Sequence, residues 1–160
     1  MLSRFFEELV NIMLIRRFRM NLLAQKLNDA LSAEITEEGF KLLLKGMALF
    51  ALIDPEFSKN LKNFNGRYLF KTINRPVNVA VTCKDGKMSV YEKTLQHYNV
   101  RVDFKDYKAV VDFLTDPDLD VLDQMLNQKL QFSGNLNYLY KFGYMARHLM
   151  QRFGIATAAA

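Results

Sequence analysis

The sequence predicts a domain of the α/β (α+β) class, in which strands and helices share one core, preceded by a helical extension. Residues 1–63 repeat apolar side chains at helical spacing, whereas residues 64–153 change to a period of two that short helical stretches interrupt. The chain has 160 residues, half of them hydrophobic, which excludes disorder as its main state. We therefore expect an extension at 1–63, a domain at 64–153 and a frayed tail at 154–160.

The extension is expected to contain two long helices and a short one. The first is predicted over Ser3–Leu31, where Ser3 suits an N-cap. The second is predicted over Thr36–Ile53, because acidic residues follow its start and Asp54-Pro55 ends it. Pro55 then suits the first turn of a short helix that reaches Lys62.

Five stretches of the second region have the alternation of strands. They are Gly66–Ile73, Val77–Cys83, Lys87–Glu92, Tyr98–Phe104 and Lys129–Ser133. Asp85-Gly86 joins the second stretch to the third, and this dipeptide is a strong hairpin signal because both residues tolerate a positive φ.

Three helices complete this region, and the last of them is the most informative. They are predicted over Asp106–Leu114, Leu119–Asn127 and Leu136–Phe153. The apolar arc of the last helix spans about 200°, twice the width that one core-facing stripe needs, and only Arg147 intrudes on it. One half of the arc can pack on a sheet. The other half must meet another helix, a partner or a ligand, and the helices of the extension could themselves cover it.

The sequence offers no residues for catalysis, a metal or a cofactor. It has one cysteine and two histidines, and Cys83 alternates with valines as a buried side chain would. No glycine-rich phosphate loop is present, and the acidic cluster at 112–123 lacks the glycine and glutamate of a calcium loop. The net charge is +5, but basic and acidic residues are interspersed, which does not favour nucleic-acid binding. We expect a protein that is not an enzyme.

The sequence also predicts where in the cell the protein is located. No apolar run approaches the length of a membrane-spanning helix, and the first residues lack a secretory layout, so the sequence predicts a cytoplasmic protein. Arg16, Arg17 and Arg19 follow an apolar run, and they could anchor the extension at an anionic membrane surface. The same arginines would equally suit a solvated helix edge.

A set of short motifs follows in one order along residues 64–150. They are a strand led by Gly66-Arg67-Tyr68, the hairpin Lys84–Lys87, the strand Val100–Phe104, a helix within Asp106–Asp118 that ends before an Asp-Pro pair, and the strand and turn Lys129–Asn135. In order and spacing they resemble the lipid-binding domain of the sterol carrier protein type-two family. Asn135 stands where the family has aspartate.

The resemblance implies a mostly antiparallel five-stranded sheet covered by helices, which encloses an apolar tunnel. The tunnel would hold a fatty acyl, sterol-like, phospholipid or isoprenoid ligand, and the family domain carries no catalytic motif. Some bacterial members assist isoprenoid-quinone biosynthesis, and these often carry extra helices before the domain, as this chain does.

Strand alternation and the apolar faces of the helices predict which residues line the tunnel. Each of these residues would equally suit an ordinary core. They are Phe70, Val79, Val81, Val90, Val102, Phe104, Phe113, Leu122, Met125, Leu126, Tyr138, Phe142, Met145 and Leu149. The resulting hypothesis is non-catalytic binding and transfer or presentation of a long-chain lipid, with peripheral membrane contact. Two alternatives stay open: an accessory interaction module for a lipid or quinone biosynthetic enzyme, and a homodimer formed through the N-terminal helices.

Overall fold

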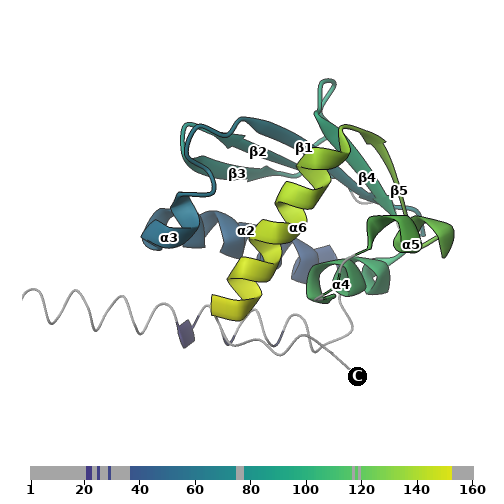
Figure 1. The fold of residues 1–160 in the computed structure, drawn as a ribbon, viewed down its shortest axis with the longest axis horizontal. Coiled ribbons are helices and arrows are strands. Elements are labelled where there is room, and N and C mark those ends of the chain that lie inside the picture. Colours follow the sequence, from purple (N-terminus) through teal and green to yellow (C-terminus); the bar gives the residue numbers. More distant parts are fainter. Residues whose placement is uncertain are drawn as a thin grey trace, which may run out of the picture.

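The computed structural model describes residues 21, 22, 25, 29, 37–74, 78–116, 118 and 120–152 (Figure 1). The first predicted helix therefore lies outside the described residues, apart from four helical positions within 21–29. The arginines at 16, 17 and 19 and the tail also lie outside them. In chain order the elements are α2 (Glu37–Ile53), α3 (Pro55–Ser58), β1 (Gly66–Thr72), β2 (Asn78–Lys84), β3 (Lys87–Tyr91), β4 (Val100–Phe104), α4 (Tyr107–Thr115), α5 (Val121–Leu126), β5 (Leu130–Gly134) and α6 (Leu136–Arg152).

The strands form one mixed sheet in the order β3-β2-β1-β4-β5. The neighbours β1 and β4 are parallel, and the other three pairs are antiparallel. The α+β class and the mostly antiparallel five-stranded sheet are therefore confirmed. The turn between β2 and β3 is the expected Asp85-Gly86 pair, whose φ values are 53° and 74°. Positive φ at both residues is what a two-residue hairpin turn of type I′ requires.

Helices α2, α3, α4 and α6 lie on one side of the sheet, and α6 crosses it (Figure 1). Strand alternation turns one set of side chains toward these helices. Tyr68 pairs with Val81, and Phe70 pairs with both Val79 and Val102, so all of them face the same side. These residues and the inner faces of the helices form one buried core.

The predicted extension contributes to this same core. Phe40, Met47 and Phe50 of α2 and Phe57 of α3 are buried together with residues of the sheet. Helix α2 packs along β3, and Lys41 and Lys45 on α2 form ion pairs with Glu92, which follows β3. A boundary near residue 63 stays a prediction, but residues 40–61 have no core separate from that of the sheet.

Aspartates start three of the helices. Asp54, Asp106 and Asp120 each accept a hydrogen bond from a backbone N–H in the first turn of α3, α4 and α5. Two helices are shorter than the sequence indicated. Helix α3 ends at Ser58 and continues as turns to Asn63, and α5 begins only at Val121, because Asp120 is its N-cap.

Candidate functional site

The candidate site is the interior between the sheet and its helices, where aromatic side chains meet in a connected group. We call this group the aromatic row. Its members are Tyr68 and Phe70 of β1, Phe104 of β4, Phe40 of α2, Phe113 of α4 and Phe142 of α6. The ring of Phe142 lies 4.7 Å from that of Phe70 and 5.4 Å from that of Tyr68, measured between centroids. The row therefore joins α6 to the middle strand of the sheet.

The wide apolar arc of α6 is buried along its length. Leu139, Phe142, Met145, Ala146 and Leu149 are among its buried residues. Part of the arc faces the sheet, and the rest is used in packing against α2, α3 and α4. The second half of the arc thus meets other helices in this structure. Methionine in such a position adapts its shape to irregular neighbours, because its side chain is unbranched and flexible.

Most of the predicted lining residues point into this interior. The buried ones are Phe70, Val79, Val81, Val102, Phe104, Phe113, Phe142, Met145 and Leu149, and the partly buried ones are Val90, Met125 and Tyr138. Tyr68 and Phe40, which complete the aromatic row, were not among the predicted lining residues. The alternation of Tyr68 with Phe70 on one strand was the signal that could have found Tyr68. Contact of these residues with a lipid, and a tunnel along them, stay predictions.

Two predicted lining residues do not face the interior. Leu122 is 59% exposed and Leu126 is 83% exposed, so their expected place in the lining is wrong. The reason is that α5 packs through Val121 and Gln124, which lie three residues apart on one face. In a helix of only six residues, the apolar spacing did not distinguish the face of Val121 and Gln124 from the exposed face of Leu122 and Leu126.

Two polar groups in this core, the hydroxyl of Tyr68 and the thiol of Cys83, are neutral. The hydroxyl of Tyr68 donates a hydrogen bond to the carbonyl oxygen of Tyr138 at 3.0 Å. Burial, and to a lesser degree the neighbouring Cys83 and Tyr138, raises the pKa of Tyr68 far above its ordinary value. Burial also raises the pKa of the Cys83 thiol to about 12. Neither group therefore carries charge at neutral pH.

The raised pKa of Cys83 gives a direct test of this interior. We expect the folded protein at pH 8 to react with Ellman's reagent at least roughly a hundredfold more slowly than the same protein in concentrated urea, because only the thiolate reacts. The two rates are measured by absorbance on one preparation, so the unfolded chain is its own control. Equal rates would show that Cys83 is not enclosed.

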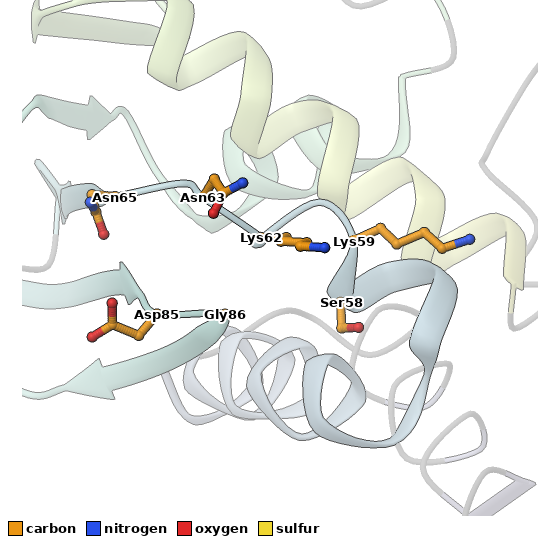
Figure 2. Close-up of a pocket in the computed structure, with 7 residues that line it drawn as sticks. All are labelled: Ser58, Lys59, Lys62, Asn63, Asn65, Asp85 and Gly86. Carbon is orange, nitrogen blue, oxygen red and sulfur yellow. The ribbon is translucent and has the colours of Figure 1, made fainter.

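A polar groove lies on the surface. It has a volume of about 430 Å³ and is lined by Ser58, Lys59, Lys62, Asn63, Asn65, Asp85 and Gly86. Figure 2 shows these side chains on the connection between α3 and β1 and on the tip of the β2–β3 hairpin. The sequence did not indicate this groove, because the α3–β1 connection and the β2–β3 hairpin, which form it, are distant in the sequence.

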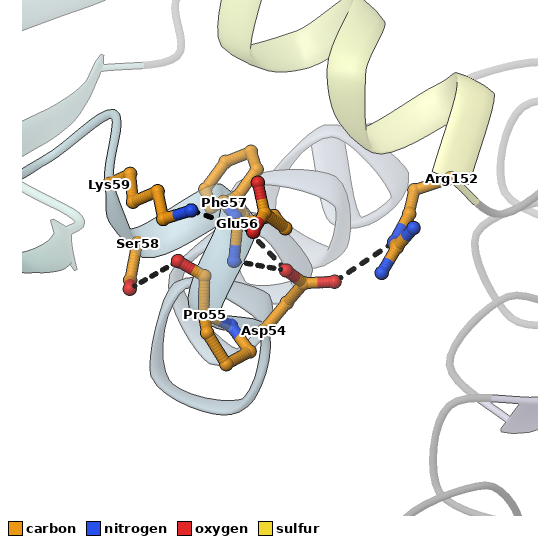
Figure 3. Close-up of polar contacts among 7 residues, drawn as sticks. All are labelled: Asp54, Pro55, Glu56, Phe57, Ser58, Lys59 and Arg152. Atoms are coloured by element: carbon orange, nitrogen blue, oxygen red, sulfur yellow. Dashed lines mark hydrogen bonds and ion pairs between the residues drawn. The ribbon is translucent and has the colours of Figure 1, made fainter.

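The end of α6 is fastened to the corner between α2 and α3 (Figure 3). The Oδ1 atom of Asp54 accepts hydrogen bonds from the backbone N–H groups of Glu56 and Phe57, at 2.8 and 3.0 Å. Its Oδ2 atom accepts a hydrogen bond from Nε of Arg152 at 3.1 Å. Burial alone would raise the pKa of Asp54, but these hydrogen bonds together outweigh burial and hold the pKa below its usual value of 3.8.

Replacing Asp54 with alanine is expected to lower the free energy of unfolding by about 1–2 kcal/mol at pH 7, since it removes a helix cap and an ion pair. The lowered pKa means that the charge of Asp54 stabilises the fold above pH 3.8 and that this contribution disappears as the pH falls through the lower folded value. Urea unfolding from pH 7 to pH 2.5 measures both effects. Asp54→Asn is the control, because it keeps the cap acceptor and loses only the charge. A pH-independent difference between wild type and Asp54→Asn would contradict this assignment.

Within the described ranges, no three His, Cys, Asp or Glu side chains are grouped so that they could hold a metal ion. No helix in that part of the chain is long and apolar enough to cross a membrane.

Comparison with known proteins identifies the fold. No protein-family model and no curated protein matches the sequence. Among solved structures, one described as "UbiJ-SCP2 Ubiquinone synthesis protein" superposes with a TM-score of 0.54 and 12% identity, covering 75% of this chain and 95% of that one. The sterol carrier protein domain 2 of Helicoverpa armigera superposes with a TM-score of 0.51 and 21% identity, covering 68% and 86%. This chain has the sterol carrier protein-2 fold.

The sterol carrier protein-2 fold also occurs as part of a larger chain. The stereoselective inverting sec-alkylsulfatase Pisa1 from Pseudomonas sp. matches with a TM-score of 0.52 and 14% identity. The match covers 81% of this chain but only 18% of the sulfatase. The resemblance noted at residues 64–150 is thus supported by structures that cover most of the chain.

Proposed function

We propose that this protein binds a long-chain apolar lipid between its sheet and its helices, and that it transfers or presents this lipid without covalent chemistry. The observation that carries the proposal is the aromatic row and its apolar surroundings, placed in the sterol carrier protein-2 fold. A fatty acyl or isoprenoid chain would gain about 0.8 kcal/mol for each methylene group that leaves water, less the cost of association.

Two features of the interior suit a ligand of imprecise shape. Met145 and Met150 of α6 and Met47 of α2 are buried beside the aromatic row and can change conformation at low cost. The ring contacts of 4.7–6.4 Å within the row also mean that a bound chain must displace or lie along these side chains. Binding should therefore couple to small movements of α6 relative to the sheet.

Among the described residues, the polar groups buried in the sheet do not favour a reaction on the ligand. A thiol with a pKa of about 12 and a tyrosine hydroxyl that donates to a carbonyl are poor nucleophiles at neutral pH. Their neutrality instead suits an apolar guest, because an apolar molecule would not compensate a buried charge.

A second candidate function is supported by the outer face of α2. Leu42, Leu49 and Leu52 are exposed on this helix. Leucines at this spacing could contact a protein partner, such as an enzyme of lipid or isoprenoid-quinone synthesis. The structural match to a ubiquinone synthesis protein favours this kind of partner over others. In this alternative the interior is ordinary core and α2 carries the function.

A titration with a fluorescent fatty acid separates the two functions. We expect saturable binding to the full chain, with displacement by unlabelled fatty acid. Phe142→Leu, in the aromatic row, should change the dissociation constant at least about fivefold, or about 1 kcal/mol. Tyr144→Leu is the matched control, because it also replaces an aromatic ring with leucine, but on the exposed face of the same helix, and should bind as wild type. Circular dichroism confirms that both variants fold.

Absence of saturable binding by the folded wild type would overturn the lipid proposal and favour the interaction module. The same conclusion follows if Phe142→Leu and Tyr144→Leu have equal effects. In that case Leu49→Glu on α2 becomes the informative variant, since it would weaken a protein contact without touching the interior.

A further inference from the structure

Arg147 lies at the edge of the buried face of α6. Its neighbours on that face, Gly143 one turn earlier and Met150 one turn later, are both buried. Arg147 is itself half-buried, whereas Arg152 at the end of the helix is exposed. The sequence already marked Arg147 as the exception within the apolar arc of this helix.

The guanidinium of Arg147 has an unmet hydrogen-bonding requirement. Its Nη1 atom is buried and has no hydrogen-bond partner. Two other arginines among the described residues have ion-pair partners: Arg101 is paired with Asp103, and Arg152 is paired with Asp54. Both have partners although their side chains are more exposed than the Nη1 atom of Arg147. No such ion pair with Arg147 occurs in the part of the chain that the structure describes.

An anionic oxygen would satisfy this arginine well. A guanidinium in a protein is a planar cation with five N–H donors and no acceptor. A buried cation is tolerated when an anionic oxygen accepts its hydrogen bonds, and the planar fork of arginine fits carboxylate and phosphate oxygens in particular.

The backbone of α6 places no side chain of its own beside the guanidinium one turn back. Side chains of a helix lean back over the preceding turn, and for Arg147 the residue one turn back on its own strip is Gly143. Glycine has no side chain, so the space beside the guanidinium at this point is not filled by α6 itself. The apolar face of the helix begins directly next to it.

We propose that Arg147 binds the anionic headgroup of the lipid, so that the preferred ligand is a single-chain acidic amphiphile that ends in a carboxylate or a phosphate. This inference rests on the proposed function and specifies its ligand class. The apolar face of α6 accommodates the chain, and Arg147 at its edge fixes the end of the molecule.

The test compares pyrene-labelled dodecanoic acid, dodecyl phosphate and dodecanol, which share one apolar chain. We expect wild type to bind the carboxylate or the phosphate at least tenfold more tightly than the alcohol, equivalent to about 1.4 kcal/mol. Arg147→Met keeps a long apolar stem, and it should abolish this preference while leaving dodecanol binding unchanged. The larger of the two anion affinities tells whether a fatty acid or a phosphorylated lipid is the source of the headgroup.

Lys141→Met is the matched control. Lys141 is a half-buried cation on the opposite edge of α6, where its Nζ lies 5.5 Å from the ring centre of Phe64. The variant Lys141→Met loses the same charge as Arg147→Met, and we expect it to keep the preference for anions.

Thermal unfolding of the ligand-free protein provides a readout independent of binding. Removing an unpaired buried charge should leave the melting temperature of Arg147→Met unchanged or raised. A marked fall would show that Arg147 has a structural role and would overturn the proposal.

The outcomes separate this inference from the function on which it rests. If wild type binds all three probes equally, or if Arg147→Met keeps the preference for anions, the headgroup role is wrong and lipid binding stands. If folded wild type binds none of the probes, the proposed function itself fails.

Discussion

Phe142→Ala is expected to lower the free energy of unfolding by about 3–5 kcal/mol, the usual cost of emptying a large aromatic site in a core. Phe142 is fully buried, and its ring contacts those of Phe70 and Tyr68 from the face of α6. The substitution removes the contact at the centre of the aromatic row, and a rigid sheet cannot collapse to fill the space. Most domains have a total stability of only about 5–15 kcal/mol.

Urea unfolding followed by circular dichroism measures this effect. Tyr144→Ala is the control, because Tyr144 lies on the exposed face of the same helix, where substitution usually changes stability by about 0.5 kcal/mol or less. A loss below about 1 kcal/mol for Phe142→Ala would mean that α6 does not pack on the sheet as described.

Gly134→Ala is expected to cost about 3 kcal/mol or more, or to prevent folding. Gly134 ends β5 with a φ of 110°, and a Cβ atom there would clash with the carbonyl oxygen of Asn99. That oxygen is fixed, because it accepts a hydrogen bond from the backbone N–H of Asn135 at 2.8 Å. The unfavourable φ and the forced backbone movement would each add about 1–3 kcal/mol.

Gly86→Ala separates the two contributions. Gly86 has a φ of 74°, but a Cβ atom there would meet nothing within 4 Å. It should therefore cost only about 1–2 kcal/mol, the penalty of a positive φ. Differential scanning calorimetry compares the two variants. Equal losses would contradict the close approach of β5 to Asn99.

Most of the fold could be predicted because its signals are local. Strand alternation placed Phe70 and Val102 on the covered face, Asp85-Gly86 set the hairpin, and an Asp-Pro pair ended both α2 and α4. The residues of the interior followed from the same alternation, since a buried face leaves little freedom in register.

The features that could not be predicted depend on contacts distant in the sequence or on very short elements. Asp54 and Arg152 are separated by 98 positions, and neither has a local pattern that points to the other. Alternation also gives no information on which strands are neighbours, so the parallel pairing of β1 with β4 needed the structure. Leu122 and Leu126 were misplaced because a helix of six residues is too short for its periodicity to decide a face.

The proposal for Arg147 needed both the sequence and the structure. The sequence showed a cation within an apolar arc, which is equally compatible with a surface residue or a buried ion pair. The structure adds that a terminal nitrogen of this cation is buried without a hydrogen-bond partner. Only this second observation turns an irregularity of the helix into a proposal about the ligand.

Native mass spectrometry of the purified full chain, followed by lipid extraction, tests lipid binding most directly. We expect a co-purified single-chain lipid with an acidic headgroup, at a ratio of about one per chain. A folded, ligand-free monomer that also fails to take up a fluorescent fatty acid would contradict the account and direct attention to the exposed leucines of α2.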